Sequence, residues 1–374
     1  MGVPGAKELE TVLTRASLLI VALTGVMWLS ACSTSKRQTA YVTTPINMGV
    51  TAFRVNTNTG SLSQILGSPY LTGVSPTAIR VHPAGKFAYV SNAGEDSISL
   101  YTIGSTGALT EVTPRTVTGD QPSDLLIAPS GQFLFSVNSA GNSVSSFTID
   151  GKSGALSPVG TPIQTAGFTP IRGAIAPSGK FLYVVNSASA TVSGFAVDGS
   201  GALAPVPNSP IRVGNGPNWI AIDPKEKFLY VANLQDGTFS GFMIDGTTGA
   251  LQAMGGSPFG VSATTSTIIP LSSLVVDASG KYLYITALNS GNNVYGFTID
   301  GTSGVPTAPV TGSPVPAGSG AAFIVNDTSG QLIFVGNQVS NSLSGFKIDA
   351  ATGVLTLIST TTTGSAPTSM VLVK

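Results

Sequence analysis

The sequence predicts an all-β fold: a seven-bladed β-propeller of four-stranded antiparallel blades, closed by a C-terminal strand that joins the N-terminal blade. Three observations support this prediction. A short apolar-aromatic strand recurs along the chain at intervals of 46 to 54 residues. The same two turn sequences recur between copies of that strand. The two ends of the chain carry complementary parts of one repeat.

The recurring strand has the pattern Phe-Leu-Tyr-Val or a close variant of it. Copies begin at Phe87, Phe133, Phe181, Phe228, Tyr282 and Leu332, and a seventh begins at Ala40. In the copy spanning 76–112 we expect strands at 76–82, 87–91, 97–103 and 108–112, with Gly and Asn between them. A repeat of this length is typical of a four-stranded propeller blade.

Two turns recur in each repeat. The turn from strand one to strand two has Asp, Ala or His first and usually Gly fourth, which is typical of a type I turn; its first residues are His82, Ala128, Ala176, Asp223, Asp277 and Asp327. The turn from strand three to strand four contains an Asp that we expect to cap its own backbone; these are Asp150, Asp198, Asp245, Asp300 and Asp349.

The ends of the chain predict how the ring closes. The first copy, at Ala40, begins with strand two, and the last residues, Pro367 to Val373, match strand one. The C-terminus therefore supplies the missing strand of the N-terminal blade, which removes a free sheet edge. We expect residues 40–374 to form a single propeller domain.

The N-terminal segment resembles a bacterial lipoprotein signal. An uncharged apolar run from Leu18 to Leu29 is too short for a comfortable transmembrane helix and ends in Leu29-Ser30-Ala31-Cys32, which resembles a lipobox. This resemblance implies a signal peptide at 1–31, followed by a lipidated Cys32 and a short tether over 32–39. The alternative is a buried cysteine in an uncleaved anchor.

Lipidation at Cys32 would place the protein in the cell envelope, bound to a membrane through its N-terminal lipid. Ser33 is not the Asp that retains lipoproteins in the inner membrane. The expected location is therefore the outer membrane or the periplasmic face in a double-membraned cell, and the extracellular face otherwise.

Composition argues against several classes of partner. Seventeen basic and seventeen acidic residues give a formal net charge of zero, so nothing directs the chain to nucleic acid. Neither a His/Cys cluster for zinc nor a carboxylate-rich loop for calcium is present in the sequence, so we predict no metal site and no cofactor.

The repeats resemble the lactonase family of seven-bladed propellers, the 6-phosphogluconolactonase-like group, and the related Tyr-Val-Thr-Asn repeat proteins. The matching pieces are the Phe-Leu-Tyr-Val-x-Asn strand, the Asp-Gly-x-x-Gly-Ala-Leu turn and Gly-Ser-Pro at 67–69, 256–258 and 312–314. The resemblance covers nearly all of 40–374. It implies the fold more specifically than an activity, because the matching residues are mostly turns and core.

One column of the innermost strands is chemically mixed and is the candidate site at the channel mouth. Its members are Ala78, Asp124, Arg172, Trp219, Ser273, Phe323 and Ser369. We predict ligand binding by Asp124, Arg172, Trp219, Ser273 and Phe323, with Asp124 and Arg172 as the candidates for a catalytic role. The alternative is a structural Asp124–Arg172 pair with Trp219 packed beside it.

Catalytic motifs are otherwise scarce. The one histidine, His82, occupies a turn position away from the expected mouth. As the resemblance implies, hydrolytic members carry His in the mixed column and Glu after the Asn of strand two. Here the column lacks His, and the residues after that Asn are Ala93, Ser139, Ser187, Leu234 and Gln338. A longer loop at 259–270 is either a lid over the mouth or a tolerated insertion.

The sequence thus leaves two functions open, and with them the question of whether the protein is an enzyme. One is ligand or partner binding at the mouth, with a carbohydrate, lactone or peptide as the ligand. The other is a lactone or carboxylic-ester hydrolase of the 6-phosphogluconolactonase type, in which Arg172 holds an anionic substrate and Asp124 activates water. The missing His favours binding, and the family resemblance favours hydrolysis.

Overall fold

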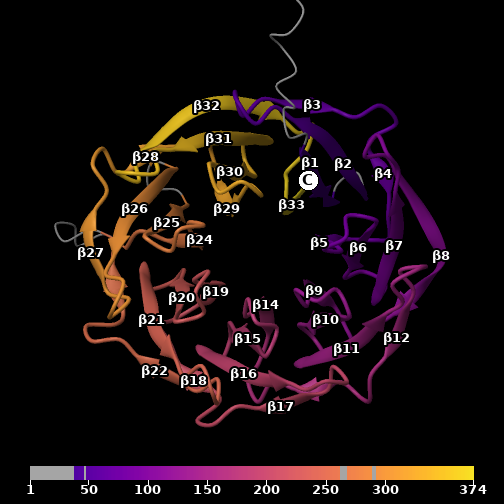
Figure 1. Cartoon of the computed structure of the whole chain (residues 1–374), viewed down its shortest axis with the longest axis horizontal. Coiled ribbons are helices and arrows are strands. Elements are labelled where there is room, and N and C mark those ends of the chain that lie inside the picture. The colour runs from indigo at the N-terminus through magenta and orange to yellow at the C-terminus, as the bar shows by residue number, and fades with distance from the viewer. Residues whose placement is uncertain (1–37, 46–47, 262–267, 289–291) are drawn as a thin grey trace, which may run out of the picture. The chain divides into compact units, whose positions relative to one another are not determined.

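The computed structural model describes residues 38–45, 48–261, 268–288 and 292–374. The predicted signal peptide, Cys32 and most of the tether lie outside these residues. From Gln38 to Lys374 the chain is one compact unit of seven antiparallel sheets arranged as a ring of blades (Figure 1). This confirms the predicted seven-bladed β-propeller. Among the described residues no helix has the length and apolar character needed to cross a membrane.

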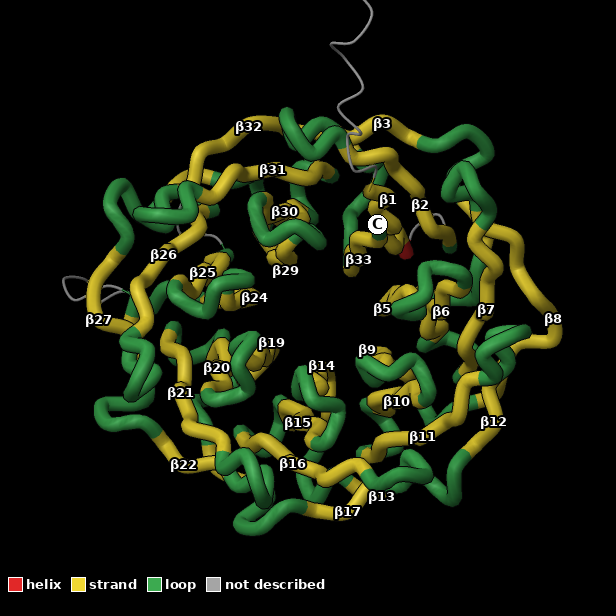
Figure 2. The backbone as a smooth tube through the Cα atoms, viewed as in Figure 1, coloured by secondary structure: helices red, strands yellow, loops and turns green. Residues whose placement is uncertain are grey.

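Each blade presents its first strand to the central axis and its last strand to the rim (Figure 2). The innermost strands are β33 (Ser369–Val373), β5 (Pro76–Val81), β9 (Pro122–Ile127), β14 (Pro170–Ile175), β19 (Pro217–Ile222), β24 (Leu271–Val276) and β29 (Ala321–Asn326). The second strands are β1 (Gln38–Thr44), β6 (Phe87–Asn92), β10 (Phe133–Asn138), β15 (Phe181–Asn186), β20 (Phe228–Asn233), β25 (Tyr282–Ala287) and β30 (Leu332–Asn337).

The third strands are β2 (Gly49–Val55), β7 (Ser97–Ile103), β11 (Ser143–Ile149), β16 (Thr191–Val197), β21 (Thr238–Ile244), β26 (Asn293–Ile299) and β31 (Ser342–Ile348). Two outer strands are continuous, β8 (Leu109–Val117) and β32 (Leu355–Thr362). The other five are each split into two short strands: β3 (Leu62–Gln64) with β4 (Tyr70–Leu71), β12 (Leu156–Pro158) with β13 (Ile163–Gln164), β17 (Leu203–Pro205) with β18 (Ile211–Arg212), β22 (Leu251–Ala253) with β23 (Phe259–Gly260), and β27 (Pro306–Pro309) with β28 (Val315–Pro316).

The split outer strands are a feature that the sequence did not predict. Four of the five splits carry a Ser-Pro pair, and proline has no N–H to donate to a ladder. The serine hydroxyl oxygen instead accepts the backbone N–H of the third strand, as Ser257 does from Gly241 at 3.0 Å. The Gly-Ser-Pro motif noted in the sequence therefore interrupts the strand while keeping the third strand's donor satisfied.

Ring closure occurs as predicted. β33 pairs with β1 in antiparallel register from Thr39↔Val373 to Thr43↔Ser369. The strand β1 begins at Gln38, two residues before the predicted domain boundary, because the ladder extends to Gln38↔Val55. The Gln38 side chain also donates from Nε2 to Asp327 Oδ2 at 2.9 Å on the adjoining blade.

The hydrophobic core is divided among the seven blade interfaces. Each of seven clusters of buried side chains joins two neighbouring blades, as Tyr41 and Val50 do with Ile79 and Val90. Each blade is thus stabilised by its neighbours on both sides, which is why the ring must close to bury the last interface.

The tyrosine of the repeated strand forms a hydrogen bond between blades. Five of these hydroxyls donate to the carbonyl of the glycine in the strand-three to strand-four turn of the next blade: Tyr41 to Gly107, Tyr89 to Gly154, Tyr183 to Gly249, Tyr230 to Gly304 and Tyr284 to Gly353. Burial raises the pKa of each of these hydroxyls. Phe135 and Phe334 occupy the position in the other two blades.

We expect Tyr183→Phe to lower the free energy of unfolding by about 1 to 3 kcal/mol, because the buried Gly249 carbonyl would lose its donor. Urea denaturation of the full chain measures this change. Tyr295→Phe is the matched control, since the Tyr295 hydroxyl hydrogen-bonds no described residue and its loss should leave the midpoint unchanged. Equal effects of the two substitutions would contradict the assigned role of the Tyr183 bond.

The predicted Asp turns are present in the structure. Asp150 Oδ1 accepts the backbone N–H of Ser153 at 2.7 Å and of Lys152 at 3.1 Å, and the Ser153 hydroxyl at 2.7 Å. These bonds, that of the Ser153 N–H foremost, lower the pKa of Asp150. Bonds of the same kind lower the pKa of Asp198, Asp245, Asp300 and Asp349.

These turns should make the propeller sensitive to acid. A carboxyl whose pKa is lower in the folded chain contributes stability above its unfolded pKa of about 3.9, and that stability is lost as the pH falls through the folded value. Thermal melts between pH 7 and pH 2.5 should therefore show a falling melting temperature below about pH 4. A variant with all five residues changed to Asn, which keeps an acceptor oxygen but does not ionise, should lose less stability on acidification. An equal loss in the variant would assign the effect to other groups.

Candidate functional site

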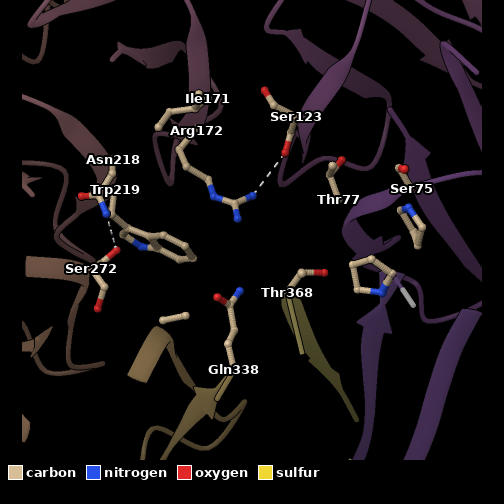
Figure 3. Close-up of a pocket in the computed structure, with 13 residues that line it drawn as sticks. Ser75, Thr77, Ser123, Ile171, Arg172, Asn218, Trp219, Ser272, Gln338 and Thr368 are labelled. Carbon is tan, nitrogen blue, oxygen red and sulfur yellow. Dashed lines mark hydrogen bonds between the residues drawn. The ribbon is translucent and has the colours of Figure 1, made fainter. Parts of the chain in front are cut away.

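The candidate site is a cavity of about 390 Å³ at one mouth of the central channel (Figure 3). Thirteen residues line it: Pro45, Ser75, Pro76, Thr77, Ser123, Ile171, Arg172, Asn218, Trp219, Ser272, Ala322, Gln338 and Thr368. They come from all seven blades, chiefly from the first residues of the innermost strands. Among them are hydroxyls, two amides, one guanidinium and one indole, with no carboxyl or imidazole group.

The rim of this cavity is a column of residues that the sequence pattern did not single out. Its seven members are Thr77, Ser123, Ile171, Asn218, Ser272, Ala322 and Thr368, each one residue before the predicted mixed column. In β5, for example, the register shifts by one residue between Pro76 and Ala78, so that Thr77 is the extra residue of a β-bulge. Similar shifts occur in β14, β19, β24 and β29. A bulge re-aims a side chain, and here it directs this column into the mouth.

Polar side chains of the rim also join neighbouring blades. The Thr77 hydroxyl donates to the Pro122 carbonyl at 2.7 Å, and the Ser123 hydroxyl donates to the Pro170 carbonyl at 3.1 Å. Asn218 Nδ2 donates to the Ser272 carbonyl at 2.8 Å, as the dashed line in Figure 3 marks. Because the hydroxyl donors of Thr77 and Ser123 are already engaged, these two residues offer a ligand acceptor oxygens, whereas the Asn218 amide keeps a second N–H.

Arg172 places its guanidinium at the floor of the mouth. Its Nη1 donates to the Ser123 carbonyl at 3.2 Å, and its Cζ lies 4.8 Å from the ring centroid of Trp219. Its Nε and Nη2 donate to no residue of the described chain. Burial lowers the pKa of Arg172 and nearby Asp124 opposes that shift. Arginine side chains keep their proton in proteins, so the group remains a cation at neutral pH. It is therefore held in place with donors free for a ligand.

Asp124 lies below the mouth and is not among the residues that line its cavity. Its side chain is 1% exposed, and Arg80 Nη2 donates to its Oδ1 at 2.6 Å, whereas Arg172 Nη1 is 3.8 Å away. Backbone N–H groups of Leu125 and Gly173 donate to its two oxygens at 2.9 and 3.1 Å. Asp124 is thus the shared counterion of two arginines, as in the structural alternative considered above, with Arg80 as the closer partner.

Arg80 is a residue whose position the sequence did not indicate. It belongs to a column that is otherwise apolar and mostly small, two positions deeper than the predicted site. The structure turns its guanidinium across the blade interface to Asp124, and Nη1 also donates to the Ile79 carbonyl at 2.9 Å. A lone arginine among small residues on an innermost strand, with an Asp on the next blade, was the signal that could have revealed this pair.

The remaining predicted residues are distributed unevenly. Trp219 lines the mouth, but Arg172 covers one face of its ring. Ser273 is fully buried, and its hydroxyl oxygen accepts the Ile324 N–H at 3.1 Å. Phe323 is 1% exposed and borders a deeper cavity instead. Of the five residues predicted to bind a ligand, Arg172 and Trp219 therefore line the mouth itself.

Gln338 is a mouth residue that follows from the strand pattern. It comes directly after Asn337, the last residue of β30, and its amide extends toward the cavity (Figure 3). This is the position at which the family resemblance implies Glu. An amide there hydrogen-bonds without a charge, which leaves the mouth without the carboxylate that the resemblance implies.

His82 has a turn role at the opposite end of its blade. Its Nδ1 accepts the Ala84 N–H at 3.1 Å, which leaves the proton on Nε2 to donate to the Gly131 carbonyl of the next blade at 3.0 Å. No group of three or more His, Cys, Asp or Glu within the described ranges could hold a metal ion. Of the long loop at 259–270, Phe259 and Gly260 form β23, and residues 262–267 lie outside the described chain.

The seven-bladed ring with a polar mouth defines a propeller with a channel-mouth site. The chain belongs to the lactonase family of seven-bladed β-propellers, whose sequence profile matches residues 31–172 and 174–372. No curated protein sequence matches the chain.

Solved structures with the same fold include a protein of Bacteroides fragilis proposed to be a 6-phosphogluconolactonase. It is 22% identical with a TM-score of 0.79, over 92% of this chain and 100% of that one. The periplasmic gluconolactonase of Pseudomonas aeruginosa is 18% identical with a TM-score of 0.76, over 90% and 99% of the two chains. At these identities the similarity establishes the fold, and the site must be judged on its own residues.

Proposed function

We propose that this lactonase-family propeller binds a small, hydroxyl-rich anion of the sugar-acid type at its mouth, on a domain anchored to the cell envelope by lipid on Cys32. The observation that carries the binding proposal is the Arg172 guanidinium, held by the Ser123 carbonyl and the Trp219 ring with Nε and Nη2 free of described partners. Guanidinium groups bind carboxylates through paired, charge-assisted hydrogen bonds. The acceptor oxygens of the rim suit ligand hydroxyls.

Hydrolysis of a lactone is the second candidate, and family membership together with the gluconolactonase name of one similar structure supports it. Arg172 would stabilise the oxyanion, as such chemistry requires. A base must also take a proton from water. The residues that line the mouth include no carboxyl or imidazole, and Asp124 is buried between its own partners. We therefore rank binding above hydrolysis.

The experiment uses the full chain with Trp28→Phe, so that Trp219 is the one remaining tryptophan and reports on the mouth. Gluconate should give a saturable change in its emission. Arg172→Met should weaken this binding at least about tenfold, as the loss of a charged hydrogen bond implies. The matched control is Arg54→Met, since Arg54 is exposed on β2 away from the channel.

Glucono-δ-lactone is tested with the same proteins. We expect its opening to stay at the background rate. Opening well above background that is lost in both Asp124→Asn and Arg172→Met would replace the binding proposal with hydrolysis. Absence of saturable gluconate binding would contradict the binding proposal.

The proposed lipid anchor agrees with the direction in which strand β1 enters the propeller. Strand β1 begins at Gln38 and ends one residue before Pro45, which lines the mouth, so the chain enters the domain at the face opposite the cavity. Five residues, 33–37, separate Cys32 from β1 and span at most about 18 Å when extended. Lipid on Cys32 would hold that opposite face near the bilayer and leave the mouth open to solutes.

Mass spectrometry of the protein from an envelope fraction should show a mature chain that begins at lipid-modified Cys32. Cys32→Ser should retain residues 1–31 or release the domain from the membrane fraction. A mature wild-type chain that still carries residues 1–31 would contradict the lipidation proposal without affecting the binding proposal.

A further inference from the structure

A second cavity of about 240 Å³ lies deeper in the same channel. It shares only Arg172 and Trp219 with the mouth cavity, so the stacked guanidinium and indole separate the two spaces. Its other lining includes Asn326 and Leu372, near the last residues of β29 and β33. The cavity, called here the lower chamber, therefore extends toward the face opposite the mouth.

The lower chamber differs from the mouth in chemistry. Its walls are chiefly apolar, with Phe323, Val325, Val371 and Leu372 beside Trp219. Sugar hydroxyls buried against such walls would lose hydrogen bonds to water without replacement, which is unfavourable. An aliphatic chain would instead gain from the same burial. The walls therefore select against the kind of ligand that suits the mouth.

The charged groups that border the chamber are cationic. Arg80 lines it with a side chain that is 27% exposed, and Arg172 borders it from the mouth side. Their one shared carboxylate, Asp124, is 1% exposed and does not line the chamber. Two guanidiniums against one carboxylate leave one net positive charge, which is poorly screened among apolar walls. A monoanion would neutralise it.

We propose that the lower chamber is a second binding site, which takes a short aliphatic carboxylate. The carboxylate contacts Arg80, whose Nη1 also donates to Ser369 Oγ at 3.5 Å, and the alkyl chain lies along Val371 and Leu372. Arg80 and Arg172 share one counterion, so an anion bound in one cavity reduces the net positive charge that attracts an anion to the other cavity. Each ligand therefore weakens the binding of the other.

The test titrates hexanoate into the full-length Trp28→Phe protein and follows Trp219, which borders both cavities. Saturable binding is expected, with affinity rising about fourfold per added methylene from butyrate to hexanoate, as burial of each methylene implies. Hexanol, without the charge, should bind at least tenfold more weakly. Affinity that does not change with chain length, or no saturable binding, would overturn the proposal.

Two variants separate this site from the mouth. Val371→Phe fills the chamber without changing a charge, and it should weaken hexanoate binding at least tenfold while gluconate binding is kept. Its control is Leu357→Phe, at an exposed position of β32, which should change the binding of neither ligand. Gln338→Ala, in the mouth alone, should weaken gluconate only. Hexanoate binding that is lost in Gln338→Ala and kept in Val371→Phe would place the aliphatic ligand in the mouth and overturn the second site. If the Trp28→Phe protein without further substitutions binds hexanoate but shows no saturable gluconate binding, only the proposed function is overturned.

Discussion

Deletion of Pro367 to Lys374 is expected to unfold the propeller or to remove most of its stability. The deletion takes away β33, so that β1 keeps β2 but loses its inner ladder partner and the N-terminal blade is left with a bare inner edge. Met370 is 4% exposed in the cluster between the first and last blades; Leu372 packs against the same cluster, and Val373 packs against the cluster between the first and second blades.

The size of this effect follows from burial. Full burial of a large apolar side chain contributes about 1.5 to 3 kcal/mol, so the loss of these side chains amounts to several kcal/mol. A typical domain has a total stability of only about 5 to 15 kcal/mol. Thermal denaturation followed by circular dichroism measures the change, and deletion of Lys374 alone is the control. A truncated protein that melts within about two degrees of the full chain would show that closure by β33 is dispensable.

Replacement of Asp124 by leucine is the second large effect expected. It leaves Arg80 and Arg172 beside each other without their counterion, and removal of one partner from a buried ion pair costs about 3 to 5 kcal/mol. Since Arg80 is 27% and Arg172 is 19% exposed, solvent screens part of this cost and the lower end is expected.

The double variant Arg80→Met with Asp124→Leu tests the reason for the loss. It removes the carboxylate together with its closer cation, so stability measured by urea denaturation should recover most of the way to that of the wild type. If the double variant were as unstable as Asp124→Leu, packing rather than charge would explain the cost.

The two candidate sites also show where reasoning from columns of the sequence succeeds and where it stops. Arg172 and Trp219 were identified because their column across the innermost strands is chemically mixed, and both line the mouth. The rest of the mouth was missed because alternation along a strand assumes an unbroken ladder. The bulge after Pro76 and its counterparts shift the register by one residue, so the preceding column faces the cavity.

The sequence by itself determined those features of the fold that depend on local patterns and their repetition. The spacing of the Phe-Leu-Tyr-Val strand set the number of blades, the Asp and Gly residues set the turns, and the unmatched ends set the closure of the ring, because each depends on residues close together in the chain or on a repeat of them. The tertiary structure alone decided which side chains meet across blades. Arg80 turns to Asp124, Arg172 stacks on Trp219, and together they divide the channel into two cavities. Those contacts depend on the angle between neighbouring blades and on bulges, which no periodicity in the sequence encodes.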